Sequence, residues 1–327
     1  MTRSPIPSAP ALLLVLVVAL SAGCSAPWMA TPHPGPTAAP APATYAVGLR
    51  SVTFSDPSRL TNPTPGQPAA ATQGRTLQAT IWYPAAGIPG AAVRAGATPA
   101  RGPFPVVLFS HGLLGMPADY QALTTRWAGT GLVVVAPAYP LTSRESAAVQ
   151  ALDVVNQPAD ATFVLTSAVR LSATPGDPFQ GLLDGRRMAA AGHSLGAITT
   201  VGLLSTCCRD ARLRAGVVLA GNWLGFSNTY TGPAAPVLFE HGDRDQLVPY
   251  ASAQRTFGAV PWPKAFVTLD GEGHLDPYLQ PASPAFAVVA ATTTEFLRWS
   301  LLADRTALDA FRHDSTVTGT AHVDDRL

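Results

Sequence analysis

The chain has 327 residues, of which 47% are hydrophobic and 13% charged, and this balance excludes an intrinsically disordered or a collagen-like protein. Its 21 basic and 20 acidic residues nearly cancel, so we expect no nucleic-acid partner. Three cysteines are too few for a fold built on disulfide bonds, and the length suffices for one domain with a large buried core.

The first 23 residues have the features of an export signal. Arg3 gives a weakly positive start, an apolar run follows at 11–20, and three small residues at 21–23 precede Cys24. The apolar run is too short to span a membrane and is typical of a signal peptide. We therefore predict that the protein works outside the cytoplasm.

The small residues that end at Cys24 resemble the lipobox of bacterial lipoproteins, in which the cysteine is acylated with diacylglycerol and becomes the new N-terminus. One difference is that Leu20 lies four residues before Cys24, where the usual pattern has it three before. The resemblance implies an exported lipoprotein anchored to the outer face of the cell membrane. The alternative is ordinary signal cleavage and a freely secreted protein. Residues 24–44 are rich in Pro, Ala and Thr and are predicted to form an extended tether.

The next part of the chain alternates predicted strands and helices. Alternating apolar and polar residues at 46–54 and 76–83 predict two antiparallel edge strands. Short continuous apolar runs, typical of strands covered on both faces, follow at 106–109, 132–136, 188–191, 216–220, 237–239 and 265–269. Helix-compatible stretches lie at 118–129, 158–169, 195–204, 250–257 and 284–302. This order predicts an α/β fold, a three-layer sandwich with a mostly parallel central sheet and antiparallel N-terminal edge strands.

The remaining segments are assigned to loops and a tail. Residues 58–74 and 84–102 are rich in Pro, Gly and Ala and are predicted to be surface loops. We find no internal repeat and no second core, so residues 45–313 are predicted to be a single domain. Residues 314–327 are polar and are predicted to be a frayed C-terminal tail.

The apolar run at 188–191 leads directly into Gly192-His193-Ser194-Leu195-Gly196, and a helix-compatible stretch follows. This is the G-x-S-x-G pattern in the strand-turn-helix context of a nucleophile elbow. The sharp turn strains the serine, and a Cβ at either flanking glycine would collide with the neighbouring strand or helix. Ser194 is therefore predicted to be a nucleophile at the carboxyl edge of the sheet.

A serine hydroxyl is a good nucleophile only when a histidine takes its proton and a carboxylate orients that histidine. In this context the acid and then the histidine are expected after later strands. The run at 265–269 opens into a glycine-flanked loop that contains His274, the predicted base. Asp243 and Asp245 compete for the role of acid. Asp245 is preferred because it lies further past the strand end, where the loop can turn back towards His274; Asp270 and Asp276 are less favoured alternatives.

Acyl transfer also needs N–H donors directed at the developing oxyanion. The amide of Leu195, the residue after the nucleophile, is predicted to be one donor. The second should follow an earlier central strand, and the strand at 106–109 leads into Ser110-His111-Gly112-Leu113-Leu114-Gly115. Glycine at 112 lets the backbone approach the substrate, so the amide of Leu113 is the second candidate. The alternative is a simple glycine-rich turn.

These motifs are similar to those of the α/β-hydrolase superfamily, more narrowly to platelet-activating-factor acetylhydrolases, dienelactone-hydrolase-like proteins and bacterial cutinase-like polyester hydrolases. The resemblance covers residues 45–304, and its specific pieces are VGLRSVTFSDPSR (47–59), IWYP (81–84), FSHGLLG (109–115), NQPAD (156–160), GHSLG (192–196), HGDRD (241–245) and GEGH (271–274). It implies hydrolysis of carboxylic esters through an acyl-enzyme by Ser194, His274 and Asp245, without a metal or organic cofactor. True dienelactone hydrolases use a cysteine nucleophile, so the serine here argues against their substrate.

Three residues that follow strand ends on the same edge are predicted to contact the substrate: Leu114, Trp223 and Tyr250. Similar enzymes place an aromatic residue near Trp223. No large lid insertion is evident between 136 and 188, so we expect an open cleft for short-chain, lipid or polyester substrates. Two other functions use the same features: a non-catalytic lipoprotein that binds a lipid, and an amidase or peptidase with the same three residues.

Cys207 and Cys208 are adjacent at the end of the helix that follows the elbow. In an exported protein they can form a vicinal disulfide, and two buried free thiols are an equal alternative. No spacing of His or Cys residues indicates a metal site.

Overall fold

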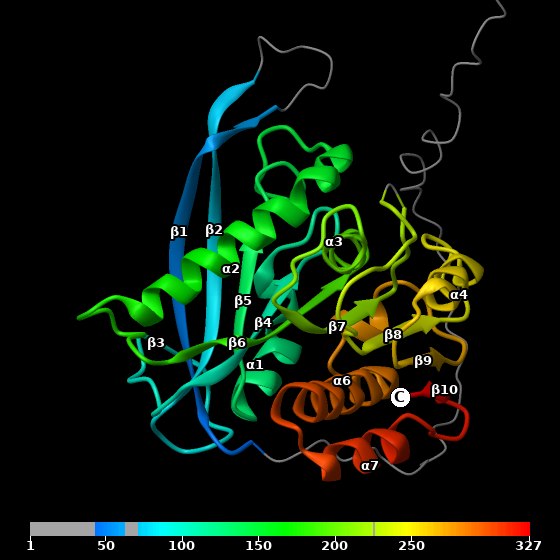
Figure 1. Ribbon diagram of the computed structural model, residues 1–327. Coiled ribbons are helices and arrows are strands. Elements are labelled where there is room, and N and C mark those ends of the chain that lie inside the picture. Colours follow the sequence, from blue (N-terminus) through cyan, green and yellow to red (C-terminus); the bar gives the residue numbers. More distant parts are fainter. Residues whose placement is uncertain (1–42, 63–70, 225) are drawn as a thin grey trace, which may run out of the picture. The chain divides into compact units, whose positions relative to one another are not determined.

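The computed structural model describes residues 43–62, 71–224 and 226–327 (Figure 1). The predicted signal peptide, Cys24 and nearly all of the predicted tether lie outside these residues. Across the described ranges, no helix combines the length and the apolar character that a membrane crossing requires.

Within the described residues, one ten-stranded sheet has the order β10-β9-β8-β7-β6-β4-β5-β2-β1-β3. Its six central strands run parallel, and they are β4 (Phe104–Ser110), β5 (Val133–Ala138), β6 (Leu183–His193), β7 (Leu213–Leu219), β8 (Val237–Gly242) and β9 (Lys264–Leu269). Strands β1 (Ala46–Thr61) and β2 (Thr72–Ala85) form an antiparallel pair at one side, with the short β3 (Arg94–Ala95) beside β1. The predicted edge strands are thus confirmed, and they extend into the segment 58–74 that was assigned to a loop.

Helices cover both faces of the sheet. One face carries α2 (Gln157–Ala173), α3 (Leu195–Leu204) and α4 (Tyr250–Ala259), and the other carries α1 (Gln121–Gly129), α6 (Pro284–Leu302) and α7 (Arg305–Asp314). Shorter helical turns are η2 (Pro117–Tyr120), η3 (Ala151–Asn156) and α5 (Asp276–Leu279).

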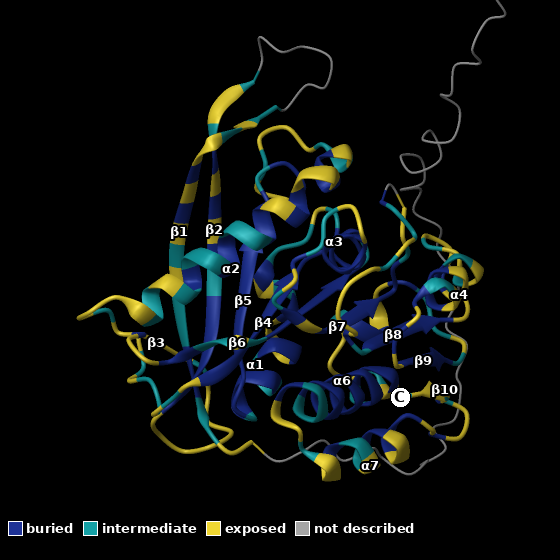
Figure 2. Ribbon diagram, viewed as in Figure 1, coloured by how far each residue is buried: buried dark blue, intermediate teal, exposed yellow. Residues whose placement is uncertain are grey.

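The central strands are buried on both faces, as their continuous apolar runs predict. Along β4, Val106 and Leu108 pack in the core layer with α2 and α3, whereas Val107 and Phe109 pack in the layer with α1 and α6. Figure 2 shows this buried centre, with exposed residues concentrated on the outer strands, the loops and the outer surfaces of the helices.

The C-terminal segment differs from its prediction. Residues Ala321–Arg326 form β10, which pairs antiparallel with β9, so the prediction of a frayed tail at 314–327 is wrong. The polar composition was misleading because β10 is an edge strand that leaves most of its side chains in solvent. Only Ala321 and Val323 turn inward, where they pack in the layer with α6 and α7.

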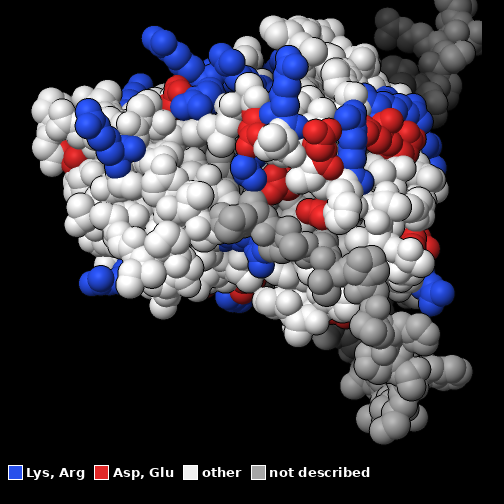
Figure 3. Space-filling model, turned by 90° about the horizontal axis from the view of Figure 1, so that it is seen from below, with Lys and Arg blue, Asp and Glu red and all other residues white. Residues whose placement is uncertain are grey.

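The surface charges agree with the near-neutral composition. On the face shown in Figure 3, basic and acidic side chains are interspersed over one part of the surface, and most of the rest is uncharged.

Candidate active site

Ser194 stands at the turn between β6 and α3, and its backbone lies in a region that L-residues rarely adopt, with φ 57° and ψ −120°. A Cβ on Gly192 would overlap the carbonyl oxygen of Gly196 in the first turn of α3. A Cβ on Gly196 would overlap the carbonyl oxygen of Ser110 at the end of β4. The expected need for glycine at both positions is therefore confirmed.

The structure brings Ser194, His274 and Asp245 together in one hydrogen-bonded series. His274 Nε2 lies 2.7 Å from Ser194 Oγ, and His274 Nδ1 lies 2.6 Å from Asp245 Oδ2. The carboxylate can only accept, so Nδ1 carries the proton of a neutral His274 and Nε2 is free to accept from the serine hydroxyl. These side chains come from the loops after β6, β8 and β9, which meet at the carboxyl edge of the parallel sheet.

Four hydrogen-bond donors surround the carboxylate of Asp245. Its Oδ1 accepts the N–H groups of Leu247 and Val248, each at 2.8 Å, and its Oδ2 lies 3.1 Å from His241 Nε2 as well as against His274. Burial alone would raise the pKa of Asp245, but the bonds to His241 and His274 outweigh it and hold this pKa well below its usual range. The group therefore stays ionised beside His274.

The competing carboxylates bond elsewhere. Asp243 accepts the Gly271 N–H at 2.8 Å, which joins the loop after β8 to the loop after β9. Asp270 bonds His322 Nδ1 at 2.8 Å, and Asp276 begins α5. The structure thus places Asp245, and not these alternatives, against His274.

The two candidate oxyanion donors flank Ser194. Leu195 is the first residue of α3, where an N–H has no acceptor within the helix. On the other side the loop after β4 comes close, since a Cβ built on Gly112 would lie 3.2 Å from the Cβ of Ser194. In the described part of the chain, the amides of Leu113 and Leu195 have no hydrogen-bond acceptor, so both are available to a ligand.

The direction of the Leu113 amide is fixed through its own peptide group. The carbonyl of that group, Gly112 C=O, accepts from His111 Nδ1 at 2.7 Å and from the Gly115 N–H at 2.9 Å. His111 Nε2 accepts the Tyr139 N–H at 3.0 Å, so the proton of this histidine is on Nδ1. Because the peptide group is planar and trans, holding its oxygen also holds its N–H on the opposite side. Burial lowers the pKa of His111 to about 4, so it stays neutral.

An apolar cluster lies beside the elbow. Its buried members come from η3, α3 and the segment after β7, and they are Val154, Leu195, Ile198 and Phe226. Two partly buried residues, Leu113 and Cys208, pack against them. Cys208 is joined to Cys207 in a vicinal disulfide, which decides between the two alternatives for this pair. The cluster makes the protein apolar on this side of Ser194.

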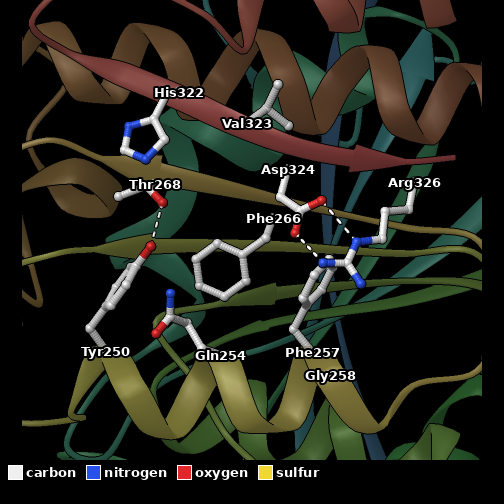
Figure 4. A pocket seen from close by; sticks show the side chains of 10 residues that line it. All are labelled: Tyr250, Gln254, Phe257, Gly258, Phe266, Thr268, His322, Val323, Asp324 and Arg326. Carbon is white, nitrogen blue, oxygen red and sulfur yellow. Dashed lines mark hydrogen bonds and ion pairs between the residues drawn. The ribbon is translucent and has the colours of Figure 1, made fainter.

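Two of the three predicted substrate contacts lie exposed on loops at the carboxyl edge: Leu114 is 51% exposed and Trp223 is 40% exposed. Tyr250 lies elsewhere. Its hydroxyl bonds Thr268 Oγ1 at 2.6 Å, and it lines a cavity of about 340 Å³ between α4, β9 and β10 (Figure 4). That cavity is lined by neither Ser194 nor His274, so the structure does not support Tyr250 as a contact for a substrate bound at Ser194.

Exposed apolar side chains gather on the segments that follow the parallel strands. Among the described residues, eight of the eleven large apolar side chains that are exposed follow the carboxyl ends of β4, β5, β7, β8 or β9. We call these eight the apolar rim, and they are Leu114, Val149, Leu152, Val155, Trp223, Leu224, Leu247 and Leu275. The sequence predicted only Leu114 and Trp223 among them. Leu247 and Leu275 lie within six residues of the ends of β8 and β9, which is a signal that could have found them, whereas Val149, Leu152 and Val155 lie more than ten residues beyond β5.

No arrangement of three or more His, Cys, Asp or Glu side chains in the described ranges is suited to hold a metal ion.

No family model and no curated protein matched the sequence. Among solved structures, the fold is similar to that of a ferulic acid esterase from Streptomyces cinnamoneus, with a TM-score of 0.62 and 23% sequence identity, covering 82% of this chain and 93% of that chain. This similarity, together with the sheet order, confirms the predicted fold class, a three-layer α/β sandwich with a mostly parallel central sheet and antiparallel N-terminal edge strands.

Proposed function

We propose that the protein is a serine carboxylic-ester hydrolase that works through an acyl-enzyme. The observation that carries the proposal is the hydrogen-bonded series of Ser194, His274 and Asp245, set on a strained elbow between two unpaired amides. The similar fold of a ferulic acid esterase supports an ester as the substrate class.

In the first half of the proposed reaction, Ser194 Oγ bonds to the carbonyl carbon of the ester while His274 Nε2 takes the hydroxyl proton. The negative oxygen that forms accepts the N–H groups of Leu113 and Leu195. The carbon–oxygen bond to the alcohol then breaks, and His274 gives its proton to the departing alcohol oxygen. Asp245 remains ionised and stabilises the positive charge on His274 between these two transfers.

In the second half, water attacks the carbonyl carbon of the acyl-enzyme and His274 takes a proton from it. The bond between the acyl carbon and Ser194 Oγ breaks, the carboxylic acid leaves, and the proton returns to Ser194. The enzyme is regenerated and needs no further reactant.

Two observations support an apolar substrate. The apolar cluster beside Ser194 offers no charged group to a bound acyl chain, and residues 220–236, which carry Trp223 and Phe226, contain no charged residue. We propose short-chain, lipid or polyester esters as the substrate class.

The test is hydrolysis of p-nitrophenyl esters from acetate to palmitate by the purified protein and by Ser194→Ala. We expect kcat to fall at least about 1,000-fold in the variant, since the nucleophile is lost. Ser205→Ala, which changes a buried serine at the opposite end of α3, is the matched control and should retain activity. Unchanged hydrolysis by Ser194→Ala would refute the proposal, and hydrolysis of matched amides in preference to esters would assign an amidase instead.

We also propose that the protein is exported and anchored through a lipid on Cys24, or secreted if the cysteine is not acylated. This proposal rests on the sequence of the export signal. Labelling of expressing cells with radioactive palmitate should mark the parent and leave Cys24→Ser unlabelled. Equal labelling of both would show that the lipid is attached elsewhere.

A further inference from the structure

A series of buried hydrogen bonds connects the loop after β4 with the loop that carries His274. The Gly112 N–H lies 3.1 Å from Tyr120 Oη, and Tyr120 Oη lies 2.9 Å from His193 Nδ1. His193 Nε2 lies 2.8 Å from the carbonyl oxygen of His274. Tyr120 and His193 are almost fully buried, at 2% and 1% exposed, so water does not compete for these bonds.

Each bond in this series has one possible direction. A backbone N–H can only donate, and a carbonyl oxygen can only accept, so His193 Nε2 must carry a proton for the His274 carbonyl. Burial, reinforced by the nearby His274, lowers the pKa of His193 to about 3, so the ring is neutral and Nδ1 has no proton. Nδ1 therefore accepts from the Tyr120 hydroxyl, whose oxygen in turn accepts the Gly112 N–H.

The rings in this series are held by packing as well. The His193 ring lies 5.0 Å from the His274 ring and 4.8 Å from the Tyr278 ring, measured between centroids, and Tyr120 packs against Phe109 at 4.6 Å. A ring that is close-packed on several sides cannot turn without displacing its neighbours. His193 is the last residue of β6 and directly precedes Ser194. Its side chain therefore links the loop that contains Gly112 to the loop that contains His274.

We propose that Tyr120 and His193 are positioning residues that hold the loop of Gly112 and the loop of His274 in a fixed relation across Ser194. The inference rests on the proposed ester hydrolysis. Through Gly112 the series holds the loop that offers the Leu113 amide to the oxyanion. Through the His274 carbonyl it holds the backbone from which that side chain reaches both Ser194 and Asp245.

The physical reason is that the transition state needs the oxyanion donor and the base in place at the same moment. A displacement of about 1 Å at either group can cost roughly 100-fold in rate. Without the Tyr120 hydroxyl, the Gly112 N–H loses its partner and the His193 proton is no longer confined to Nε2. A proton on Nδ1 would leave the Nε2 lone pair facing the His274 carbonyl oxygen, and that repulsion would push the base out of position.

The first experiment compares steady-state kinetics of Tyr120→Phe with Tyr83→Phe. Tyr83 is an equally buried tyrosine in β2, and its hydroxyl donates to the Ala97 carbonyl oxygen at 2.7 Å, outside the series. We expect Tyr120→Phe to lower kcat about 10- to 100-fold with KM changed less than about twofold. Tyr83→Phe should change kcat by less than about threefold. Equal effects of the two variants on kcat would overturn the proposal.

The second experiment is independent of activity. Nitrogen-15 NMR of the histidine-labelled parent protein should show His193 as the neutral tautomer with its proton on Nε2, the signal being assigned by its loss in His193→Gln. In Tyr120→Phe the same signal should shift towards the other tautomer. A proton on Nδ1 of His193 in the parent would refute the series. If Ser194→Ala kept full activity, the proposed reaction would fail while this tautomer remained measurable, so the two failures are distinguishable.

Discussion

At the scale of single residues, Glu240 shows what burial does to a group outside the proposed reaction. It lies in β8 against α6, where Oε1 accepts from Thr292 Oγ1 at 2.5 Å. In the described part of the chain, Oε2 has no hydrogen-bond partner. Burial raises the pKa of Glu240 to about 8, so the folded protein holds this carboxyl protonated at neutral pH.

This raised pKa predicts a pH-dependent stability. The unfolded chain releases the proton near pH 4.5, its ordinary value, whereas the folded chain keeps it to about pH 8. The contribution of Glu240 to the free energy of unfolding is therefore fully present below about pH 4.5. It is lost as the pH rises from 4.5 to 8, by up to about 1.4 kcal/mol per pH unit. Glu240→Gln, which resembles the protonated group, should remove this slope in urea unfolding at pH 5 to 9.

Glu145→Gln is the control for Glu240→Gln, because Glu145 is exposed and should leave the slope unchanged. Parallel pH profiles for the parent and Glu240→Gln would contradict the prediction.

At the scale of elements, a buried ion-pair network ties β2 to two helices. Arg75 of β2 is 1% exposed and forms paired hydrogen bonds with Asp153 of η3 and Asp160 of α2, at distances of 2.6 to 3.1 Å. Because η3 also carries Val154 of the apolar cluster, the network connects the edge strands to one wall of the candidate site.

Arg75→Met should destabilise the fold by about 3 kcal/mol, because it leaves the buried Asp153 without its cation and leaves Asp160 with Arg59 as its one remaining cationic partner, at 2.7 Å. The free energy of urea unfolding measures this loss. Arg144→Met, which removes the exposed pair of Arg144 with Asp119, should change stability little. A similar small effect of both variants would mean that Asp153 and Asp160 find other partners or become protonated at little cost.

At the scale of the whole molecule, the parallel sheet explains why the apolar rim exists. Loops that follow parallel strands all emerge at the same edge, so apolar side chains separated by more than 150 residues, such as Leu114 and Leu275, gather at that edge. Exposed apolar residues grouped at one edge are typical of a site that contacts another apolar surface. We propose that the rim contacts an ester presented as an aggregate or a solid.

The double variant Leu152→Ser/Val155→Ser removes apolar contact area without touching Ser194. It should therefore lower activity on an emulsified ester about threefold or more, and change activity on a dissolved short-chain ester less than twofold. Both residues are exposed, at 45% and 56%, so the fold should tolerate the change. Ile88→Ser is the matched control, since Ile88 is 77% exposed after β2, which runs antiparallel to β5 and ends at the opposite edge. Equal losses on both substrates would rule out a role of the rim in surface contact.

Local patterns in the sequence were sufficient for most elements. The helices expected at 195–204 and 284–302 have those bounds in the structure, and each predicted central strand is present. Such patterns succeed because an apolar period, a capping residue or a G-x-S-x-G turn acts over a few neighbouring residues. The order of Ser194, Asp245 and His274 along the chain predicted that their side chains lie together, and the structure places them in hydrogen-bond contact. Their roles in catalysis stay predictions.

The tertiary structure decided what depends on residues far apart in the chain. It placed Asp245 rather than Asp243 against His274, directed Tyr250 into another cavity, and made a strand of the polar segment 321–326 by pairing it with β9. It also fixed the buried series from Gly112 to His274, which no spacing in the sequence reveals. The reason is that hydrogen bonds and packing between loops are set by how the sheet brings strand ends together, and a linear pattern carries only the local part of that information.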